Sequence, residues 1–264
     1  MEPFIKWAGG KRWLVSDSAF SLPRFSGRYI EPFLGGGAVF FHLQPDAAIL
    51  SDLNVRLIEV YQAIRNDWKK VQNELYRLQK KHSREFYYQE RSRKRLTKHT
   101  RAAQFIYLNR TCWNGLYREN SKGQFNVPIG TKNKVIMDND DFKMASDILS
   151  RADVSANDFE HTMSQARDGD LIFLDPPYTT AHNLNGFLKY NQKIFSWDDQ
   201  VRLKKCISLA LDRGAKVILT NADHSSLHEL YNDIAKIKSL ERFSRISGKS
   251  AFRKITSESL FLFE

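Results

Sequence analysis

The chain has 264 residues, of which 42% are hydrophobic and 12% aromatic, and a net charge of +11, so it can bury the core of one large domain or of a domain with an insertion. No apolar run approaches the ~18 residues of a membrane span, and residues 1–11 lack a signal peptide's apolar core, so a cytoplasmic protein is expected. The two cysteines, Cys112 and Cys206, have no metal-ligand spacing, which argues against a disulfide framework and a structural zinc ion.

Two short apolar runs near the N-terminus each end at an unusual cluster of residues. Residues 28–30 lead into the sequence EPFLGGG at residues 31–37. Residues 47–50 lead into SDLN at residues 51–54, and helical periodicity follows over residues 55–67. We predict that both apolar runs are strands.

The same arrangement returns in the second half of the chain. Residues 171–174 lead into the DPPY motif at residues 175–178, and residues 216–219 lead into Thr220-Asn221. A helix is expected between them over residues 197–212. Strands that alternate with helices predict an α/β fold with a doubly wound, Rossmann-like parallel sheet, whose ligands bind beyond the carboxyl ends of the strands. Those ends carry the clusters.

A long charged helical pattern and a loop-like stretch at residues 110–130 break this alternation between residues 68 and 140. We predict that residues 68–140 form a mostly helical domain inserted into a sheet domain, which is made of residues 1–67 and 141–264. Residues 258–263 are expected to be a closing strand of the sheet.

The inserted segment carries the whole excess of positive charge. Residues 68–122 hold 15 Lys and Arg against 4 Glu and no Asp, whereas the rest of the chain is balanced. A solvated helical face and a phosphate-binding surface are both compatible with such a run, and for residues 91–95 we favour nonspecific phosphate contacts. Interleaved aromatic and amide side chains favour nucleic acid as the partner, namely Phe86, Tyr87, Tyr88, Trp113, Asn114 and Tyr117.

The glycine turn, Gly35 to Gly37, follows the first predicted strand and precedes a helix expected over residues 38–43. Glycines there permit close backbone approach to a ligand, although a plain tight turn would look the same. Asp52, after the next strand, favours a ligand because an acidic residue at that place can hydrogen-bond ribose hydroxyls. The chain lacks GxGxxG, and Arg12 after Lys11 rules out a P-loop, so adenosine without a pyrophosphate fits best.

The DPPY motif is the sharpest signal in the chain. Its two prolines, Pro176 and Pro177, fix two backbone φ angles and remove two donors, so the Pro176 carbonyl can face a ligand beside the Asp175 carboxylate. Two acceptors would push electron density back onto an aromatic amino nitrogen, which could then attack a methyl sulfonium. Tyr178 offers a ring on which a base can stack. A rigid strand-end turn with a capping Asp is the structural alternative.

These residues resemble a known family, the Dam-type adenine-N6 DNA methyltransferases of class alpha (D12). The order of parts agrees over nearly the whole chain: KWAGGK at residues 6–11, the glycine turn, a recognition insertion and DPPY. The resemblance implies a site-specific DNA methyltransferase that uses S-adenosylmethionine and no metal ion. The resemblance places nine residues at the cofactor: Trp7, Gly10, Lys11, Phe33, Gly35, Asp52, Asp158, Phe159 and Asp175. Among them, Asp52 would bind the ribose, and Asp158-Phe159 would hold the adenine ring. The catalytic pocket would consist of Asp175, Pro176, Pro177 and Tyr178.

By the same similarity, residues 110–130 form a recognition hairpin that reads double-stranded DNA, usually at GATC, while the target adenine is flipped out of the stack. The residues expected at the DNA are Lys6, Trp113, Asn114, Leu116, Arg118 and Pro128. No membrane and no obligate protein partner are implied, and the protein is expected in a bacterium or as a phage product. Membership of a restriction-modification system and action without a restriction enzyme are both compatible with the sequence.

Two other functions remain compatible with parts of the sequence. Amino methylation of RNA or of a protein glutamine also uses an Asp/Asn-Pro-Pro-aromatic pocket. The basic insertion argues against a protein substrate. Competition between duplex DNA and RNA would show which of these two nucleic acids is the substrate. A catalytically inactive DNA-binding module is disfavoured by the intact Asp52 and Asp175, and incorporation of a labelled methyl group would decide that question.

Overall fold

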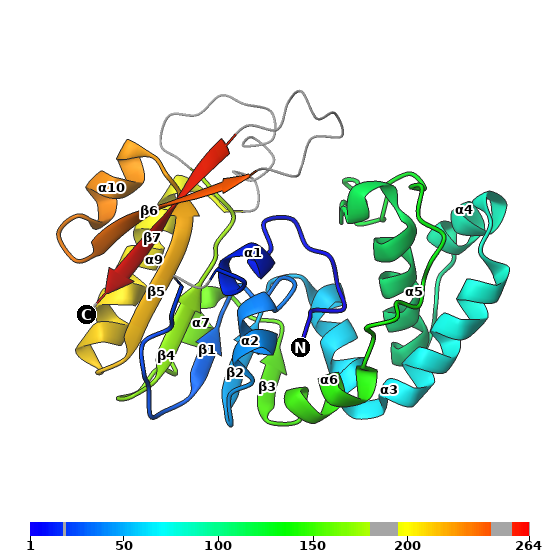
Figure 1. Cartoon of the computed structure of the whole chain (residues 1–264), viewed down its shortest axis with the longest axis horizontal. Coiled ribbons are helices and arrows are strands. Elements are labelled where there is room, and N and C mark those ends of the chain that lie inside the picture. The colour runs from blue at the N-terminus through cyan, green and yellow to red at the C-terminus, as the bar shows by residue number, and fades with distance from the viewer. Residues whose placement is uncertain (18–19, 180–194, 244–254, 264) are drawn as a thin grey trace. The chain divides into compact units, whose positions relative to one another are not determined.

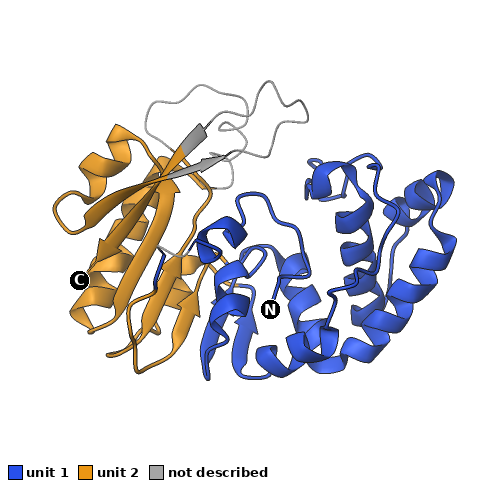
Figure 2. Cartoon of the chain, viewed as in Figure 1, with its two compact units in different colours: residues 1–21, 34–156 blue, residues 22–33, 157–264 orange. Residues whose placement is uncertain are grey.

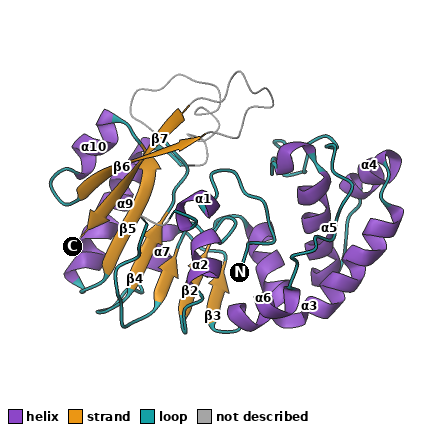
Figure 3. Ribbon diagram, in the orientation of Figure 1, coloured by secondary structure: helices purple, strands orange, loops and turns teal. Residues whose placement is uncertain are grey.

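The structure is a computed structural model that describes residues 1–17, 20–179, 195–243 and 255–263 (Figure 1). Its strands are β1 (Tyr29–Glu31), β2 (Ala48–Ser51), β3 (Ala152–Ser155), β4 (Leu171–Leu174), β5 (Lys216–Ala222), β6 (Lys236–Phe243) and β7 (Ile255–Phe263). They form a seven-stranded, mostly parallel sheet in the order β3-β2-β1-β4-β5-β7-β6 (Figure 3). The predicted doubly wound α/β fold is therefore confirmed.

The helices expected over residues 38–43, 55–67 and 197–212 are present, the second as the start of a longer helix, and others were not predicted. The helices are α1 (Arg12–Val15), α2 (Ala38–Leu43), α3 (Val55–Lys81), α4 (Arg84–Ser92), α5 (Lys98–Thr111), η1 (Trp113–Gly115), α6 (Phe142–Leu149), α7 (Phe159–Met163), α9 (Trp197–Asp212) and α10 (Ser225–Tyr231). The bounds of α2, α9 and β4 are those the sequence predicted. Among the residues that the structure describes, no helix is both long and apolar enough to cross a membrane.

The chain divides into two compact units, shown in two colours in Figure 2. The first unit consists of Met1–Ser21 and Leu34–Ala156, and the second of Leu22–Phe33 and Asn157–Glu264. The first therefore holds the glycine turn and the recognition hairpin, and the second holds the DPPY motif.

In the first unit, β2 and β3 pair in parallel, and the helices α3, α4 and α5 lie side by side (Figure 1). The backbone of α3 is interrupted at Asp67, where φ is −157° and ψ is 63°. The predicted domain boundary after residue 67 falls at this break, and the boundary before residue 141 falls at Asp141, whose side chain caps α6. The inserted domain itself stays a prediction, because the first unit extends past both boundaries.

In the second unit, β1, β4 and β5 are parallel, whereas β7 is antiparallel to β5 and β6 is antiparallel to β7. All four residues of β4 are buried, which fits a central strand that is covered on both faces and reads as a continuous apolar run. The strand β7 spans the residues expected to close the sheet. The direction of the strand order reverses between β1 and β4, and ligands bind beyond the carboxyl ends of the strands at such a point.

Candidate functional site

The DPPY motif begins directly after β4, and Thr220 of β5 holds its first residue. Thr220 Oγ1 donates a 3.0 Å hydrogen bond to Asp175 Oδ1 and lies 3.3 Å from the carbonyl oxygen of Leu174. Leu174 pairs with Leu219 in the parallel register, so Asp175 lies opposite Thr220 at the ends of the two strands. Because Thr220 is fully buried, its hydroxyl fixes the orientation of the Asp175 carboxylate.

The phenol of Tyr178 is anchored as well. Its hydroxyl donates a 2.6 Å hydrogen bond to Oε2 of Glu258, a residue of β7 that is almost completely buried. Such a bond to a buried acceptor holds the half-buried Tyr178 ring in one plane. Sequence reasoning assigned no role to Glu258 or Thr220, although a lone acidic residue in an apolar strand was a signal that could have drawn attention to Glu258.

A third pair of polar residues lies at the end of β1. The hydroxyl of Tyr29 donates a 3.0 Å hydrogen bond to Glu31 Oε2, and both residues are buried. Burial raises the pKa of Tyr29 well above its usual value, and the charges of Glu31 and Asp175 raise it further. Tyr29 therefore stays neutral and donates its hydroxyl proton to Glu31.

Phe33 and Phe159, both expected at the cofactor, are in contact in the structure, and Arg202 packs beside them. The two rings stack at 5.4 Å with an interplanar angle of 28°. Phe159 is buried and Phe33 is half-buried, so Phe33 is the ring with exposed surface. The guanidinium of Arg202 lies 4.2 Å above the Phe159 ring and binds both carboxylate oxygens of Asp158, at 2.8 and 3.0 Å. Asp158 also caps α7 by accepting from the backbone N–H of Glu160.

In the first unit, Asp52 is tied to the glycine turn. Its Oδ2 accepts a 3.0 Å hydrogen bond from the backbone N–H of Gly35, and its Oδ1 accepts one of 2.9 Å from Asn54. Burial raises the pKa of Asp52, and these two hydrogen bonds oppose the shift only in part. The side chain that caps α3 is that of Asn54, which accepts from Leu57, so Asp52 is not the helix cap.

The KWAGGK segment packs on the same turn through Trp7. A Cβ atom at Gly35, whose φ is +47°, would lie 2.6 Å from Cδ1 of Trp7, so only glycine fits there. The backbone N–H of Gly10 donates to the carbonyl of Trp7 at 3.2 Å. The buried Lys11 side chain turns back to donate to the carbonyl of Gly9 at 2.9 Å. Trp7, Gly10, Lys11, Gly35 and Asp52 therefore lie in one connected group, and their role in cofactor binding stays a prediction.

The recognition hairpin is closed by two isolated antiparallel bridges, Cys112 with Ile129 and Glu119 with Phe125. Near its base, the backbone N–H of Trp113 donates to the carbonyl of Pro128 at 2.9 Å. The Trp113 side chain is half exposed, so it is not a core residue.

Several of the predicted DNA-contacting residues are accessible in this hairpin. Asn114 is exposed and adopts a left-handed backbone conformation with a φ of +54°. Arg118 is exposed too, and its Nε donates a 2.8 Å hydrogen bond to the side-chain oxygen of Asn126 across the hairpin. That bond orients the guanidinium through its Nε atom and does not involve the two terminal nitrogens.

Lys6 lies at the base of the hairpin. Its backbone N–H and carbonyl both bind the side-chain amide of Asn109, at 2.9 and 2.8 Å. A Cβ atom at Gly115 would meet Cδ of Lys6 at 2.5 Å. Partial burial and the charge of Lys132 lower the pKa of Lys6. A positively charged side chain is thus placed beside the residues predicted to read DNA.

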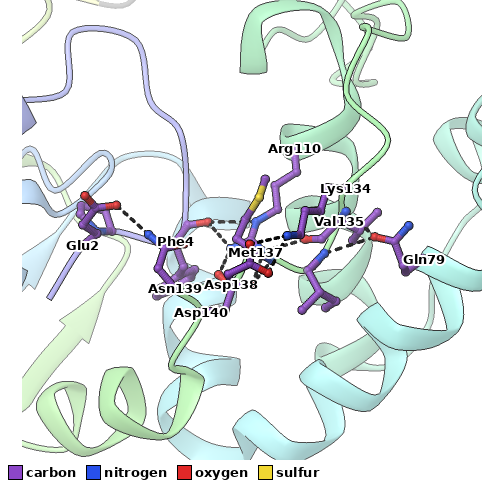
Figure 4. A network of polar contacts seen from close by, with 12 residues as sticks. Glu2, Phe4, Gln79, Arg110, Lys134, Val135, Met137, Asp138, Asn139 and Asp140 are labelled. Atoms are coloured by element: carbon purple, nitrogen blue, oxygen red, sulfur yellow. Dashed lines mark hydrogen bonds and ion pairs between the residues drawn. The ribbon is translucent and has the colours of Figure 1, made fainter.

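The basic segment at residues 68–122 is only partly available to a ligand. Eleven of its fifteen Lys and Arg side chains are exposed. Arg110, in contrast, is buried and makes a bidentate ion pair with Asp140 at 2.5 and 2.6 Å, and it also donates to the carbonyls of Phe4 and Val135 (Figure 4).

Within the run at residues 91–95, the expectation of phosphate contacts is wrong for Arg95. Its guanidinium makes a bidentate ion pair with Glu90 and also binds Glu74, so it serves the fold. Arg91 donates to the backbone carbonyl of Val127 in the recognition hairpin. Internal carboxylates can turn basic side chains inward, which composition alone does not reveal. In the described residues, no group of three or more His, Cys, Asp and Glu could hold a metal ion.

Comparison with known proteins gives one consistent result. The family model of the D12 class N6 adenine-specific DNA methyltransferases matches residues 7–246. The chain is 36% identical to the Type II methyltransferase M1.LlaDCHI of Lactococcus lactis subsp. cremoris, over 97% of this chain and 93% of the relative. It is 37% identical to the Type II methyltransferase M.MjaIII of Methanocaldococcus jannaschii, over 84% of each chain. It is 30% identical to the DNA adenine methylase of Escherichia coli (strain K12), over 99% of this chain and 95% of that enzyme.

Proposed function

The chain belongs to the D12 class of N6 adenine-specific DNA methyltransferases, and on that basis we propose that it methylates the N6 amino group of an adenine flipped out of duplex DNA, within the sequence GATC. The family uses DNA as substrate and S-adenosylmethionine as methyl donor. GATC is the site implied by the resemblance to Dam-type enzymes. The observation that carries the proposal is the Asp175 carboxylate, held by Thr220 at the end of β4.

The chemistry of the amino group explains what Asp175 does. The N6 lone pair of adenine is delocalised into the ring, so the nitrogen is a weak nucleophile. A hydrogen bond accepted by Asp175, and a second one accepted by the carbonyl of Pro176, draw the amino protons away and return electron density to nitrogen. Methyl transfer and the proton loss that follows it need no strong base, because the methylated ammonium is acidic enough to lose its proton to water or to Asp175.

Tyr178 supports the flipped base. A base extruded from the duplex loses its stacking partners, and an aromatic ring replaces them with about 1–3 kcal/mol per base. The bond from the Tyr178 hydroxyl to Glu258 holds the ring ready before the base arrives. Pro177 keeps the backbone between the carboxylate and the ring rigid, since proline fixes φ and has no N–H.

For the cofactor, the donor set of the protein fits adenosine. S-adenosylmethionine, when bound, supplies a methyl group on a positively charged sulfur. We assign the ribose hydroxyls to the Asp52 carboxylate, an acceptor already oriented by Gly35. The indole of Trp7 borders that site, together with Gly10 and Lys11.

The adenine ring of the cofactor is assigned to three residues of the second unit. The partly exposed ring of Phe33 would stack on the adenine, and the buried ring of Phe159 packs against Phe33. Asp158 is proposed to accept a hydrogen bond from the cofactor's amino group, in addition to those from Arg202 and Glu160.

For sequence recognition, we assign the recognition hairpin to the major groove. Trp113 would fill the gap left by the flipped adenine, and Asn114 would bind its orphaned partner base. Leu116 contacts a thymine methyl group, whereas Arg118 binds guanine through its planar fork of donors. Lys6 contacts a base from the side opposite the recognition hairpin, and Pro128 lies beside the DNA.

The test is transfer of a labelled methyl group to GATC duplexes, to duplexes with each single base changed, and to RNA of the same sequence. We expect N6-methyladenine in the GATC duplex alone. Asp175→Ala should abolish transfer and leave DNA binding largely intact, because the carboxylate serves the reacting amino group. Near-normal turnover by Asp175→Ala contradicts the proposed pocket, and equal transfer to all duplexes contradicts GATC as the site.

A further inference from the structure

We propose that Tyr117 is a positioning residue that couples the cofactor-binding turn to the recognition hairpin, so that cofactor occupancy and specific DNA binding strengthen one another. Tyr117 itself reads no base. It lies between Leu116 and Arg118, the two residues assigned to thymine and guanine. The inference rests on the proposed function, because it takes those two assignments as given.

The ring of Tyr117 lies in a continuous aromatic stack within the first unit. On one side it stacks on Trp7 at 5.5 Å, with an interplanar angle of 26°, and on the other side on Phe105 of α5 at 4.9 Å, again with 26°. Trp7 in turn packs directly on Gly35 of the glycine turn. A single row of rings thus joins the cofactor turn, the hairpin and a helix of the inserted segment.

The hydroxyl of Tyr117 makes a second connection to the same turn. It donates to the carboxylate of Glu119, which pairs with Arg56 in the first turn of α3 at 3.4 Å. Burial raises the pKa of Tyr117, and Glu119 raises it further, so the hydroxyl stays a neutral donor to that carboxylate. Arg56 lies two residues after Asn54, whose side chain caps α3. Asn54 also donates its backbone N–H to Asp52.

Both ends of the Tyr117 side chain are therefore linked to the proposed cofactor-binding group. The ring stacks on Trp7, and the hydroxyl is linked through Glu119 and Arg56 to the start of α3, where Asn54 binds Asp52. A ligand that immobilises Trp7 and Asp52 removes freedom from the Tyr117 ring and hence from the backbone on either side of it. The first ligand to bind bears the entropic cost of ordering these residues. The second ligand then binds to a chain that is already ordered, so its affinity is higher, which is positive coupling. By linkage, the factor by which cofactor tightens DNA binding must equal the factor by which DNA tightens cofactor binding.

The experiment measures that factor in solution. The dissociation constant of a GATC duplex is determined with and without saturating S-adenosylhomocysteine, which cannot react, and the reciprocal measurement is made with saturating duplex. For the unmodified protein we expect a factor of at least about 5, the lower end of typical coupling energies. A duplex with one changed base pair should show a factor close to one, because Leu116 and Arg118 then lack their bases.

Variants separate coupling from folding. Tyr117→Ala and Tyr117→Leu should both reduce the factor to near one; the Leu variant fills the space without offering a stacking face. Tyr117→Phe keeps the stack and loses the hydroxyl, so its factor should lie between those of the unmodified protein and Tyr117→Ala. Tyr76→Ala removes an exposed tyrosine of α3 and is the matched control, with an unchanged factor.

A factor of one in the unmodified protein overturns the inference, and so does an unchanged factor in both Tyr117→Ala and Tyr117→Leu. Methyl transfer to the GATC duplex by the unmodified protein is measured in parallel. Absence of that transfer contradicts the proposed function, whereas transfer together with unchanged coupling in the variants contradicts only the role of Tyr117.

Discussion

The hydroxyl of Thr220 donates a 3.0 Å hydrogen bond to Oδ1 of Asp175, although the two residues lie 45 positions apart in the chain. Their meeting depends on the parallel register of β4 and β5, which places the residues that follow Leu174 and Leu219 opposite each other. Thr220 is not part of the DPPY motif, yet its hydroxyl sets the direction in which the Asp175 carboxylate points.

Replacing Thr220 with Val removes this hydrogen bond and keeps the shape of the side chain. We expect kcat to fall about 10- to 100-fold, because a hydrogen bond to a charged acceptor is worth roughly 1.5–3 kcal/mol and Asp175 loses its orientation. DNA affinity should not change. Thr220→Ser, which restores the hydroxyl, should recover most of the rate in a single-turnover methylation assay; equal loss in the Val and Ser variants would assign Thr220 to packing alone.

Asp52→Ala should weaken S-adenosylmethionine binding about 10- to 100-fold, on the same magnitude for a charged acceptor, with little change in DNA affinity measured without cofactor. Equilibrium dialysis with labelled cofactor gives the dissociation constant. If that constant is unchanged, Asp52 serves only to hold Gly35 and Asn54.

The raised pKa of Asp52 predicts a pH dependence of the same binding step. Burial makes the folded carboxyl take up a proton at a higher pH than an ordinary Asp, so cofactor affinity should decline as the pH falls through that raised pKa. Protonation at this group favours the folded chain, because the folded state binds the proton more tightly than the unfolded state. Cofactor affinity should therefore decline at a higher pH than that of acid unfolding. The weaker binding of Asp52→Ala should lack this pH dependence.

Arg118→Ala should relax discrimination at one base pair by about 1–3 kcal/mol and leave the salt dependence of DNA binding nearly unchanged. Lys94→Ala is the matched comparison, because Lys94 is an exposed cation of the basic run. It should weaken binding to all sequences alike and flatten the salt slope by ~0.9. Methylation rates on GATC and on each single-base variant decide the matter: a uniform slowing in Arg118→Ala would make Arg118 a phosphate anchor.

Arg110→Met should destabilise the protein by about 3–5 kcal/mol, because it leaves the carboxylate of Asp140 buried without its partner. The carbonyls of Phe4 and Val135 lose their donor as well (Figure 4). Urea unfolding followed by circular dichroism measures the change. Lys143→Ala, which breaks the exposed pair with Asp147, is the control and should leave the unfolding midpoint in place; a similar midpoint for both variants would show that the buried pair contributes little.

Local periodicity determined most of the secondary structure in advance. The apolar run of β4 and the pattern of α9, whose Ser196 and Asp199 form a capping box, carry their own boundaries in the sequence. The strands β3 and β6 were not predicted. The strand β3 has only four residues, and its partner β2 lies about a hundred positions earlier in the chain. In β6 the apolar residues Ile237, Leu240 and Phe243 recur at every third position, which is not the period of a strand.

The sequence by itself determined the chemistry of this protein: a DPPY motif after a buried strand, a glycine turn followed by Asp52, and a basic segment with interleaved aromatic residues. Each of these signals is local, because a motif's residue types and spacing suffice to show it. Only the tertiary structure decided which side chains support the motifs. Thr220 reaches Asp175, Tyr117 stacks on Trp7, and Arg95 and Arg110 turn inward to buried carboxylates, because contacts between distant segments depend on strand register and helix packing, which leave no periodic trace in the chain.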